Sequence, residues 1–351
     1  MRQAGYILLL LWGVATVVFF LFYVIPGDPA QMMLGQRDDE EQRLAINSKY
    51  GFNLPLGTQY AYFLNDLSPV SIHHSKSGHI SSLEPDKYTG LVWNVGDSWN
   101  AMLKWPYLRT SFQQRGASVS TLIAQVLPNT AILAGTSIFI AFIVGLLFGT
   151  ISALFPNTIW DRSLATISTL GMSLPSFFSA ILMAWLFGFV WSSWTGLDMT
   201  GSLFAIDDYG EGSYLALDHL ILPAITLGVR PLAVITQLTR NSLLQTLDEG
   251  YIRTARAKGL GPLQVVWKHA LRNALNPIIT ATSGWFAGML AGAVFVEFIF
   301  GWNGLGKLLV DSLNTLDLPV VMGVVLTLSV IFVAINAAVD HIYKLIDPRI
   351  E

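Results

Sequence analysis

Long hydrophobic runs separated by short polar stretches dominate the pattern of this chain. A helix needs about 20 mainly apolar residues to cross a bilayer. Five runs meet this requirement without a charged side chain: residues 5–25, 128–156, 163–190, 273–296 and 318–339. A sixth run, residues 219–238, is interrupted by Arg230 and Pro231, which predicts a helix that is kinked or partly lined by other protein. We therefore expect an all-α polytopic membrane protein with six transmembrane helices.

Composition agrees with a chain that lies mostly in lipid. Hydrophobic residues make up 53% of it and charged residues only 12%, about half the charged share of a soluble domain. The first run follows Arg2, as a secretory signal would, but it is too long for a signal core and ends in IPGDPA without a small-x-small cleavage pattern. We interpret it as an uncleaved membrane helix.

The orientation follows from lysine and arginine, which are enriched in the cytoplasmic loops of membrane proteins. With the N-terminus inside, the short external loops hold only Lys307, and residues 191–218 hold several acids but no lysine or arginine. The cytoplasmic pieces hold Arg2, Arg162, Arg240, Arg253, Arg256, Lys258, Lys268, Arg272, Lys344 and Arg349. This asymmetry predicts that both termini are cytoplasmic.

This topology predicts three parts. They are an N-terminal helix (residues 1–25), an extracytoplasmic segment (26–120) and a five-helix core (121–351) that contains a cytoplasmic loop at 240–275. We expect the extracytoplasmic segment to have only a thin core of its own. The chain has no cysteine, so no disulfide can stabilise this segment. Its tryptophans, which would suit the lipid interface, include Trp93, Trp99 and Trp105.

The cytoplasmic loop contains a basic, amphipathic stretch, residues 249–277. One apolar stripe in it has helical spacing: Leu263, Val266, Trp267, Ala270, Leu271 and Ala274. Pro262 suits the first turn of that helix, and Gly259 suits the left-handed end of a shorter helix before it. Two short helices are therefore expected to meet at 259–262. Their tip, residues 256–260, would face a protein or anionic lipid headgroups.

Several strings of residues carry a family resemblance. They are RQAGYILLLL leading to IPGDPA, LRTSFQQRGASV before LPNTAILA, YIRTARAKGL followed by HALRNAL, GAVFVEFIFGWNGLGKLLVDSL, and NAAVDHIYKLIDPRIE. Together they resemble the membrane subunits of ABC-type importers, specifically the dipeptide, oligopeptide and nickel permease family. The resemblance spans nearly the whole chain and implies the type I ABC importer permease fold, with an extracytoplasmic segment between the first two helices.

In this family the cytoplasmic loop is the coupling segment, which docks on an ATPase subunit. The loop resembles the EAA-type motif: Ala255, Gly259 and Leu271 keep its alanine, glycine and later leucine. Arg253 and Arg272 replace its acid and its late proline, a departure that favours the peptide branch. The resemblance assigns coupling to Arg253, Ala255, Arg256, Lys258, Gly259, Leu260, His269, Leu271 and Arg272.

The resemblance also implies a function and its partners. The chain would form half of the translocation path for di- or oligopeptides in an ATP-driven importer of a bacterial cytoplasmic (inner) membrane. Its expected partners are a second homologous permease, two cytoplasmic ATPase subunits, an extracytoplasmic substrate-binding protein and the bilayer, with no nucleic acid. The ATPase subunits would bind ATP and magnesium, so we expect neither a cofactor nor a catalytic residue in this chain. A permease for nickel or another small solute is one alternative. The other is an ion-coupled secondary transporter, which needs no docking elbow.

One string mimics a nucleotide-binding motif. Residues 301–307, GWNGLGK, satisfy the Gly-x-x-x-x-Gly-Lys part of a phosphate-binding loop. Leu308 stands where the magnesium-binding hydroxyl is required, and the topology places the loop outside, after a membrane helix. We expect no nucleotide there. The sequence also lacks the His-Glu-x-x-His and Gly-x-Ser-x-Gly motifs, so we expect no enzyme.

Polar residues within spans are functional candidates by default, which draws attention to Arg230, Glu297, Asn336 and Asp340. Glu297 and Asp340 lie close to the ends of their spans, where hydrogen bonding or pairing at the interface is the favoured role. Arg230 is deeper. It would line the pathway or pair with an acid of the partner permease, and the residues leave both roles open.

A histidine cluster, His73, His74 and His79, lies in the extracytoplasmic segment. No acid or cysteine stands at a recognisable ligand spacing, and the surroundings are typical of a flexible, Ser-rich loop. We therefore expect no metal site. The segment is longer than its counterpart in the family, so residues 68–106 are interpreted as an insertion.

Overall fold

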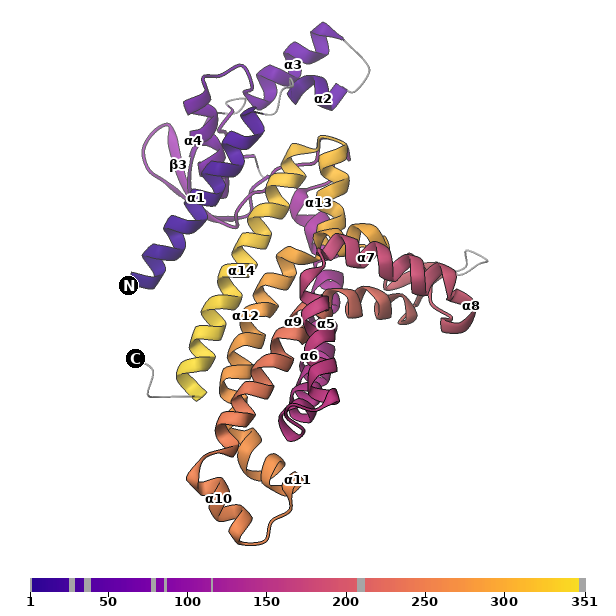
Figure 1. The fold of residues 1–351 in the computed structure, drawn as a ribbon. Coiled ribbons are helices and arrows are strands. Elements are labelled where there is room, and N and C mark those ends of the chain that lie inside the picture. Colours follow the sequence, from indigo (N-terminus) through magenta and orange to yellow (C-terminus); the bar gives the residue numbers. More distant parts are fainter. Residues whose placement is uncertain are drawn as a thin grey trace. The chain divides into compact units, whose positions relative to one another are not determined.

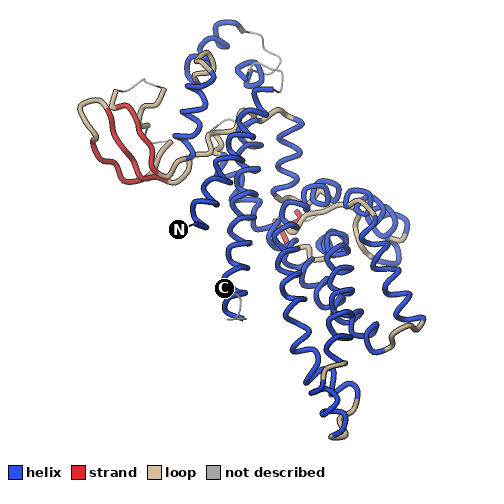
Figure 2. Tube along the Cα trace, turned by 60° about the vertical axis from the view of Figure 1, so that its left-hand side comes forward, coloured by secondary structure: helices blue, strands red, loops and turns tan. Residues whose placement is uncertain are grey.

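The computed structural model describes residues 2–24, 29–34, 39–76, 80–84, 87–114, 116–206 and 212–346. Most of these residues are helical, and a small sheet follows the fourth helix (Figures 1 and 2). Contacts divide the chain into two compact units. One comprises Met1–Gln125 and Leu308–Val330, and the other comprises Val126–Lys307 and Ile331–Glu351.

The first unit begins with four helices and three strands. These are α1 (Arg2–Val24), α2 (Pro29–Leu34), α3 (Glu40–Tyr50), α4 (Leu56–Leu67), β1 (Val70–His74), β2 (Gly90–Asn94) and β3 (Trp99–Lys104). Parts of α5 (Val119–Leu154), α13 (Leu305–Asn314) and α14 (Leu318–Ile346) complete it. Local sequence sets the ends of α3: the Asp39 carboxylate accepts the Glu41 amide at 3.1 Å, and Gly51 ends the helix with a φ of 73°.

The sheet has the strand order β1-β3-β2, with both pairs antiparallel (Figure 2). Alternation along β1 buries Ser71 and His73 completely and leaves Val70 and Ile72 more than half exposed. The expectation of a flexible, Ser-rich loop around His73 is therefore wrong. Val70 and Ile72 are β-branched and alternate with polar residues, which is the signal of a strand.

The second unit holds most of the apolar helices. Its elements are α6 (Ile159–Ser173), α7 (Ser176–Trp185), η1 (a π-helix, Leu186–Val190), α8 (Ser192–Thr195), β4 (Phe204–Ile206), β5 (Ser213–Leu215), α9 (Asp218–Leu247), α10 (Gly250–Ala257), α11 (Pro262–Val265), η2 (a π-helix, Val266–Ala270) and α12 (Leu271–Phe300). Helix α9 packs against both α6 and α12. Figure 1 shows these long helices running side by side.

The described residues contain three to five candidate membrane spans. Three single helices qualify by length and composition: Val119–Leu154, Asp218–Leu247 and Leu318–Val339. Two bent pairs add one span each if each pair crosses once: Ile159–Ser173 with Ser176–Val190, and Pro262–Leu290 with Ala293–Phe300. The first predicted span contains a shorter apolar helix, Gly5–Leu21.

The helix that carries Arg230 is continuous despite its two prolines. Pro223 and Pro231 both lie inside α9, and more than half of its apolar window is buried. This burial accords with a helix partly lined by other protein. The sharper of the two bends falls elsewhere, between α6 and α7, which meet at 108°. Pro175 explains it, because a residue before proline avoids the helical region, and Leu174 has φ −82° and ψ 135°.

Two glycines allow α5 and α9 to approach closely. A Cβ atom on Gly149 would lie 2.6 Å from the carbonyl oxygen of Thr236, and one on Gly145 would lie 2.8 Å from Cγ2 of Ile235. Small residues let the backbones of membrane helices come together in this way. The core at this level contains Ala141, Ile235 and Ile278, all completely buried.

Candidate functional site

The basic loop folds into an elbow of two short helices, which we define as residues 248–270. Helix α10 follows α9 after Asp248 and Glu249, and α11 leads through η2 into α12 without an intervening loop. Figure 1 shows α10 and α11 beyond the ends of α9 and α12. The elbow thus connects two long apolar helices directly.

Gly259 forms the turn of the elbow as the sequence predicts. Its φ is 80°, in the left-handed region that glycine adopts without strain. The Gly259 amide donates to Arg256 O at 3.0 Å and the Leu260 amide to Ala255 O at 3.4 Å, the paired bonds of a Schellman motif. Pro262 begins α11, where its missing amide hydrogen costs nothing.

The elbow has a hydrophobic core of its own. Ile252 and Ala255 of α10 are buried against Val265 and Val266, and Leu243 of α9 joins them. Ala153 near the end of α5 belongs to the same cluster. Residues packed around this core are Leu146, Leu154, Leu244, Leu247, Leu260 and Leu275. Packing of this kind fixes the elbow to the ends of α5, α9 and α12.

The π-helix η2 changes the predicted apolar stripe. Val266, Ala270, Leu271 and Ala274 are buried as expected, but Leu263 and Trp267 are 63% and 54% exposed. A π turn holds one residue more than an α turn and so shifts the phase of the side chains. The six residues of the predicted stripe therefore do not share one environment, because Leu263 and Trp267 are exposed and the other four are buried.

The exposed face of the elbow is basic, with apolar side chains among the charges. Arg253, Arg256, Lys258, Lys268 and Arg272 are all exposed, and none has an ion pair among the described residues. Of the other residues that the resemblance assigns to coupling, Gly259 is exposed, Leu260 and His269 are half-buried, and Ala255 and Leu271 are buried. The Asn273 amide also donates to the Tyr251 hydroxyl at 2.7 Å, linking α12 to α10.

A groove of about 510 Å³ lies beside the elbow. It is lined mainly by apolar side chains, with Arg256 and Asp248 among them. Leu260 and Pro262 contribute from the turn, and Leu154 and Pro156 from the end of α5 and the residues after it. An apolar groove with a charged group of each sign at its edge is suited to receive part of another protein.

The candidates within the spans are placed differently from one another. Arg230 is exposed on α9 and has no hydrogen bond or ion pair among the described residues. Asn336 donates to Phe332 O in its own helix at 2.8 Å, so its amide is satisfied locally. Asp340 lies in α14, but its side chain is outside the described residues.

Glu297 is completely buried and occupies the loop that mimics a phosphate-binding motif. Its Oε2 atom accepts the Gly306 amide at 2.6 Å and the Lys307 amide at 3.3 Å. Trp302 is also buried and donates from Nε1 to Asn129 O at 3.0 Å. The Glu297 carboxylate thus accepts two amides of the glycine loop, in keeping with the hydrogen-bonding role favoured from the sequence.

The structure also joins two residues that the sequence did not connect. Asp161 lies in the first turn of α6 and is 6% exposed, and it forms an ion pair with Arg240 of α9 at 2.7 Å. The Asp161 carboxylate also accepts the Asn157 amide at 2.9 Å. The sequence alone indicated only that Arg240 lies on the cytoplasmic side. The available signal of an ion pair was Asp161, a single acid next to Arg162 in a charge-poor chain.

Two groups of side chains contain residue types that bind metals. His73 and His74 are neighbours on β1 and so point to opposite faces of the sheet, and His79 lies outside the described residues. His73 instead hydrogen bonds through Nε2 to Ser71 Oγ at 2.8 Å. A different group, Asp198, Asp218 and His219, brings its ligand atoms within 4.8 Å of one another. Exposed carboxylates often gather without an ion, so this group alone defines no metal site.

Long apolar helices satisfy their backbone hydrogen bonds internally, as segments that cross a bilayer must, and here they carry a basic elbow at one end. The comparisons with known proteins agree. Residues 145–351 match the family described as binding-protein-dependent transport system inner membrane component. Residues 1–81 match the N-terminal domain of the same kind of membrane component. The chain belongs to this family of ABC importer permeases and is a non-catalytic, multi-pass inner membrane component.

Similar proteins match along almost their whole length. The di/tripeptide transport system permease DppB of Pseudomonas aeruginosa is 34% identical, with 99% of this chain and 97% of the relative covered. The oligopeptide transport system permease AppB of Bacillus subtilis is 32% identical, with 97% and 95% covered. The dipeptide permease DppB of Escherichia coli K12 is 30% identical, with 100% and 97% covered.

Among solved structures, the inward-facing MetNI methionine ABC transporter is similar in fold. One chain of it has a TM-score of 0.51 and 22% sequence identity. The match covers 65% of this chain and 97% of that chain. A likeness at this identity concerns the fold alone, which is that of an ABC importer permease.

Proposed function

We propose that this chain forms half of the translocation path for di- or oligopeptides in an ATP-driven importer. The observation that carries the proposal is full-length similarity to three permeases whose names specify dipeptides, tripeptides or oligopeptides. The other half of the path belongs to a second, homologous permease. An extracytoplasmic binding protein captures the substrate, and two ATPase subunits bind ATP and magnesium.

The elbow, with the first turn of α12, is the surface that docks on an ATPase subunit. Three observations support this role: the Gly259 turn is rigidly bonded, the elbow has its own core, and Leu263 and Trp267 are exposed beside unpaired basic residues. Exposed aromatic side chains supply much of the energy of protein interfaces. Arg253, Arg256, Lys258 and Arg272 complement an acidic groove, whereas Ala255 and Leu271 maintain the core of the elbow.

The proposed topology has six spans with both termini in the cytoplasm. Residues 1–25, which contain helix α1, form the first span. Each of the two bent pairs, Ile159–Ser173 with Ser176–Val190 and Pro262–Leu290 with Ala293–Phe300, counts as one span. Residues 26–120 are extracytoplasmic, with an insertion near 68–106, and the permease core is 121–351. Within this topology Arg230 faces the pathway or an acid of the second permease, since an exposed charge in lipid needs a partner.

Docking is tested with Trp267→Ala in the full-length chain, co-purified with its ATPase subunits in mild detergent. We expect at least tenfold less ATPase recovered, because the exposed ring forms the contact. Trp194→Ala is the matched control, since Trp194 is 90% exposed but lies on α8. Equal recovery with both variants contradicts the docking role of the elbow.

The substrate is tested by reconstituting the complete importer in proteoliposomes with ATP inside. We expect ATP-dependent uptake of labelled dialanine that requires the binding protein. Mass spectrometry of the ligand that purifies with the binding protein provides an independent measurement. The proposed substrate is contradicted if dialanine is not taken up and the binding protein carries a nickel chelate in place of a peptide. That outcome leaves the proposed ATPase docking intact.

A further inference from the structure

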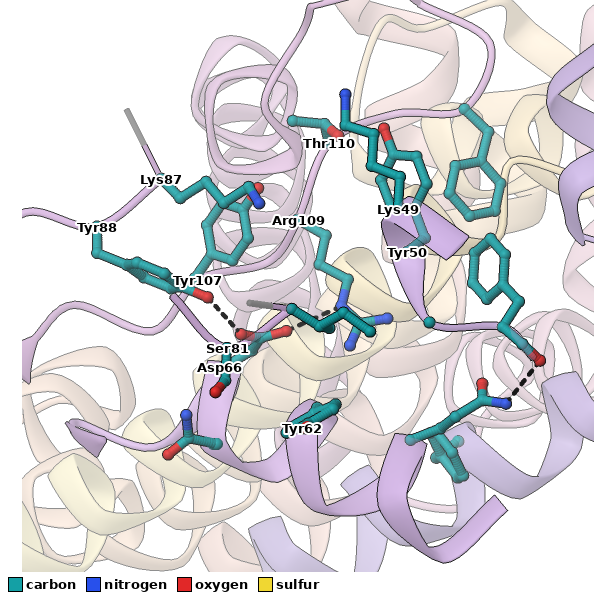
Figure 3. Close-up of a pocket in the computed structure, with 17 residues that line it drawn as sticks. Lys49, Tyr50, Tyr62, Asp66, Ser81, Lys87, Tyr88, Tyr107, Arg109 and Thr110 are labelled. Carbon is teal, nitrogen blue, oxygen red and sulfur yellow. Dashed lines mark hydrogen bonds and ion pairs between the residues drawn. The ribbon is translucent and has the colours of Figure 1, made fainter. Parts of the chain in front are cut away.

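A small pocket in the first unit has no part in the coupling described above. Its volume is about 90 Å³, room for roughly six water-sized atoms. Residues from α3, α4, the turns around the sheet and the segment before α5 line it (Figure 3). It lies entirely within the proposed extracytoplasmic segment, apart from Phe19 of α1.

Asp66 lines the pocket, but its carboxylate and backbone oxygens already accept hydrogen bonds. Its Oδ1 atom accepts the Tyr88 hydroxyl at 2.9 Å, and its Oδ2 atom accepts Nε of Arg109 at 3.0 Å. Its backbone oxygen accepts the Tyr107 amide at 2.9 Å and the Lys104 ammonium group. Asp66 therefore positions its neighbours and is poorly placed to receive a cationic ligand.

Arg109 uses only one of its five N–H donors in a hydrogen bond to the described residues. Nε serves Asp66, but Nη1 and Nη2 have no acceptor among the described residues, and the side chain is 30% exposed. Figure 3 shows the guanidinium group among Asp66, Tyr50 and Tyr62, which also line the pocket. A guanidinium with two free terminal nitrogens binds a carboxylate through two parallel hydrogen bonds.

The backbone of Arg109 also has an unusual conformation. Its φ is 66°, in the left-handed region that few residues other than glycine, asparagine and aspartate adopt. Such a conformation is strained and persists only where the surroundings hold it. Here the ion pair with Asp66 and the Phe63 ring, 5.8 Å from Cζ, hold the guanidinium in place.

The rest of the pocket favours an anion with an apolar part. Three cationic side chains line it, Lys49, Lys87 and Arg109, against the single carboxylate of Asp66. Lys87 pairs with Glu84 at 2.8 Å, whereas Lys49 has no ion pair among the described residues. Phe52 and Phe112 add apolar walls in edge-to-face contact, with ring centroids 6.1 Å apart. Burial raises the pKa of Tyr107 to about 12, so its hydroxyl stays neutral.

We propose that this pocket binds the carboxylate of a small organic molecule, with Nη1 and Nη2 of Arg109 as its hydrogen-bond donors. Lys49 adds positive charge, and the aromatic walls cover the rest of the ligand. Two sources share this chemistry, a peptide C-terminus and a free organic acid. The site is independent of the elbow, so it stands whether or not the elbow docks an ATPase.

The test is a titration of the full-length chain in nanodiscs, followed by saturation-transfer NMR of the probe. N-acetylglycine carries the carboxylate, N-acetylglycinamide is its neutral match, and glycylglycine represents a peptide C-terminus. The first variant is Arg109→Gly, because glycine accepts the left-handed backbone while removing the guanidinium. Lys49→Met is the second, with Lys76→Met as its control, since Lys76 is exposed and does not line the pocket.

We expect N-acetylglycine to bind at least tenfold more tightly than the amide. Arg109→Gly should weaken its binding at least tenfold, Lys49→Met about threefold, and Lys76→Met not at all. Comparable affinity for glycylglycine identifies a peptide C-terminus as the source, and weaker affinity identifies a free acid. Equal binding of acid and amide overturns the proposal, as does unchanged binding in Arg109→Gly. If that variant unfolds, unchanged binding in both Arg109→Lys and Lys49→Met overturns it.

Discussion

Arg240 donates two hydrogen bonds to Asp161, from Nε to Oδ1 at 2.7 Å and from Nη2 to Oδ2 at 2.8 Å. The pair ties α9, the helix that leads into the elbow, to the start of α6. Bidentate pairs of this kind fix orientation as well as distance. Asp161 is nearly buried, so this pair differs from an ordinary surface ion pair.

Breaking this pair should destabilise the protein clearly. Arg240→Gln leaves the Asp161 carboxylate nearly buried without its cation, and we expect a loss of about 2 to 4 kcal/mol in the free energy of unfolding. Thermal unfolding in detergent provides the measurement. Asp198→Asn is the control, because Asp198 is 66% exposed in its pair with His219 and should cost less than about 1 kcal/mol. Equal losses in the two variants contradict the prediction.

Gly259 should be replaceable by asparagine but not by valine. No atom lies within 4 Å of a Cβ placed on Gly259, so its φ of 80° alone sets the cost. Asparagine tolerates the left-handed region, whereas a β-branched residue does not. We expect Gly259→Val to insert into the membrane normally while uncoupling ATP hydrolysis from transport. Normal substrate-stimulated ATPase activity in the reconstituted valine variant sinks this prediction.

Two glycines in α5 should respond differently to alanine. Gly149→Ala forces a methyl group against Thr236 and Thr239, which we expect to cost about 1 to 3 kcal/mol by separating α5 from α9. Gly135→Ala on the same helix meets no atom within 4 Å and should be neutral or slightly stabilising. Unfolding midpoints of the two variants in detergent decide between close packing and a general intolerance of alanine.

The sheet should loosen as pH falls. Burial, with Lys104 nearby, lowers the pKa of His73 below its ordinary 6.5. Below pH 6.5 the unfolded chain therefore holds a proton that the folded chain does not, and stability falls as the pH approaches the lower, folded pKa. Hydrogen exchange of the β1 and β3 amides, corrected for intrinsic rates, should show less protection at pH 5 than at pH 7.5.

His73→Leu removes the titrating group and should flatten this pH dependence. His74→Gln is the control, because His74 is only partly buried on the same strand. The interpretation fails if the leucine variant loses protection at pH 5 to the same extent as the parent.

The sequence predicted what depends on local patterns. Runs of apolar residues located the long helices, and Gly259 with Pro262 located the turn of the elbow, because these features need no information from elsewhere in the chain. The 108° break at Pro175 was also encoded locally, but the apolar run continues through it and masks it. Hydrophobicity alone cannot distinguish a straight span from a bent pair.

The features that the sequence did not predict depend on residues far apart in the chain or on the helical phase of the side chains. Asp161 and Arg240 are separated by 79 positions, and only packing of α6 on α9 brings them together. Leu263 and Trp267 fit a helical stripe by their spacing, but the π-helix η2 shifts the phase of the side chains, and both are exposed. Nor did spacing reveal that Glu297 fills its own glycine loop, since the contact depends on how Gly306 and Lys307 turn back on α12.

The absence of a loop between α11, η2 and α12 has a mechanical consequence. The backbone is helical from Pro262 to Leu290, so no loop separates the exposed ring of Trp267 from the part of α12 that ends at Leu290. A sideways force on Trp267 is transmitted as torque about the axis of this helix, because no loop between them can absorb it. The extra residue in η2 sets the direction of the Trp267 side chain relative to α12. Deleting one residue there would turn that direction by roughly 100°.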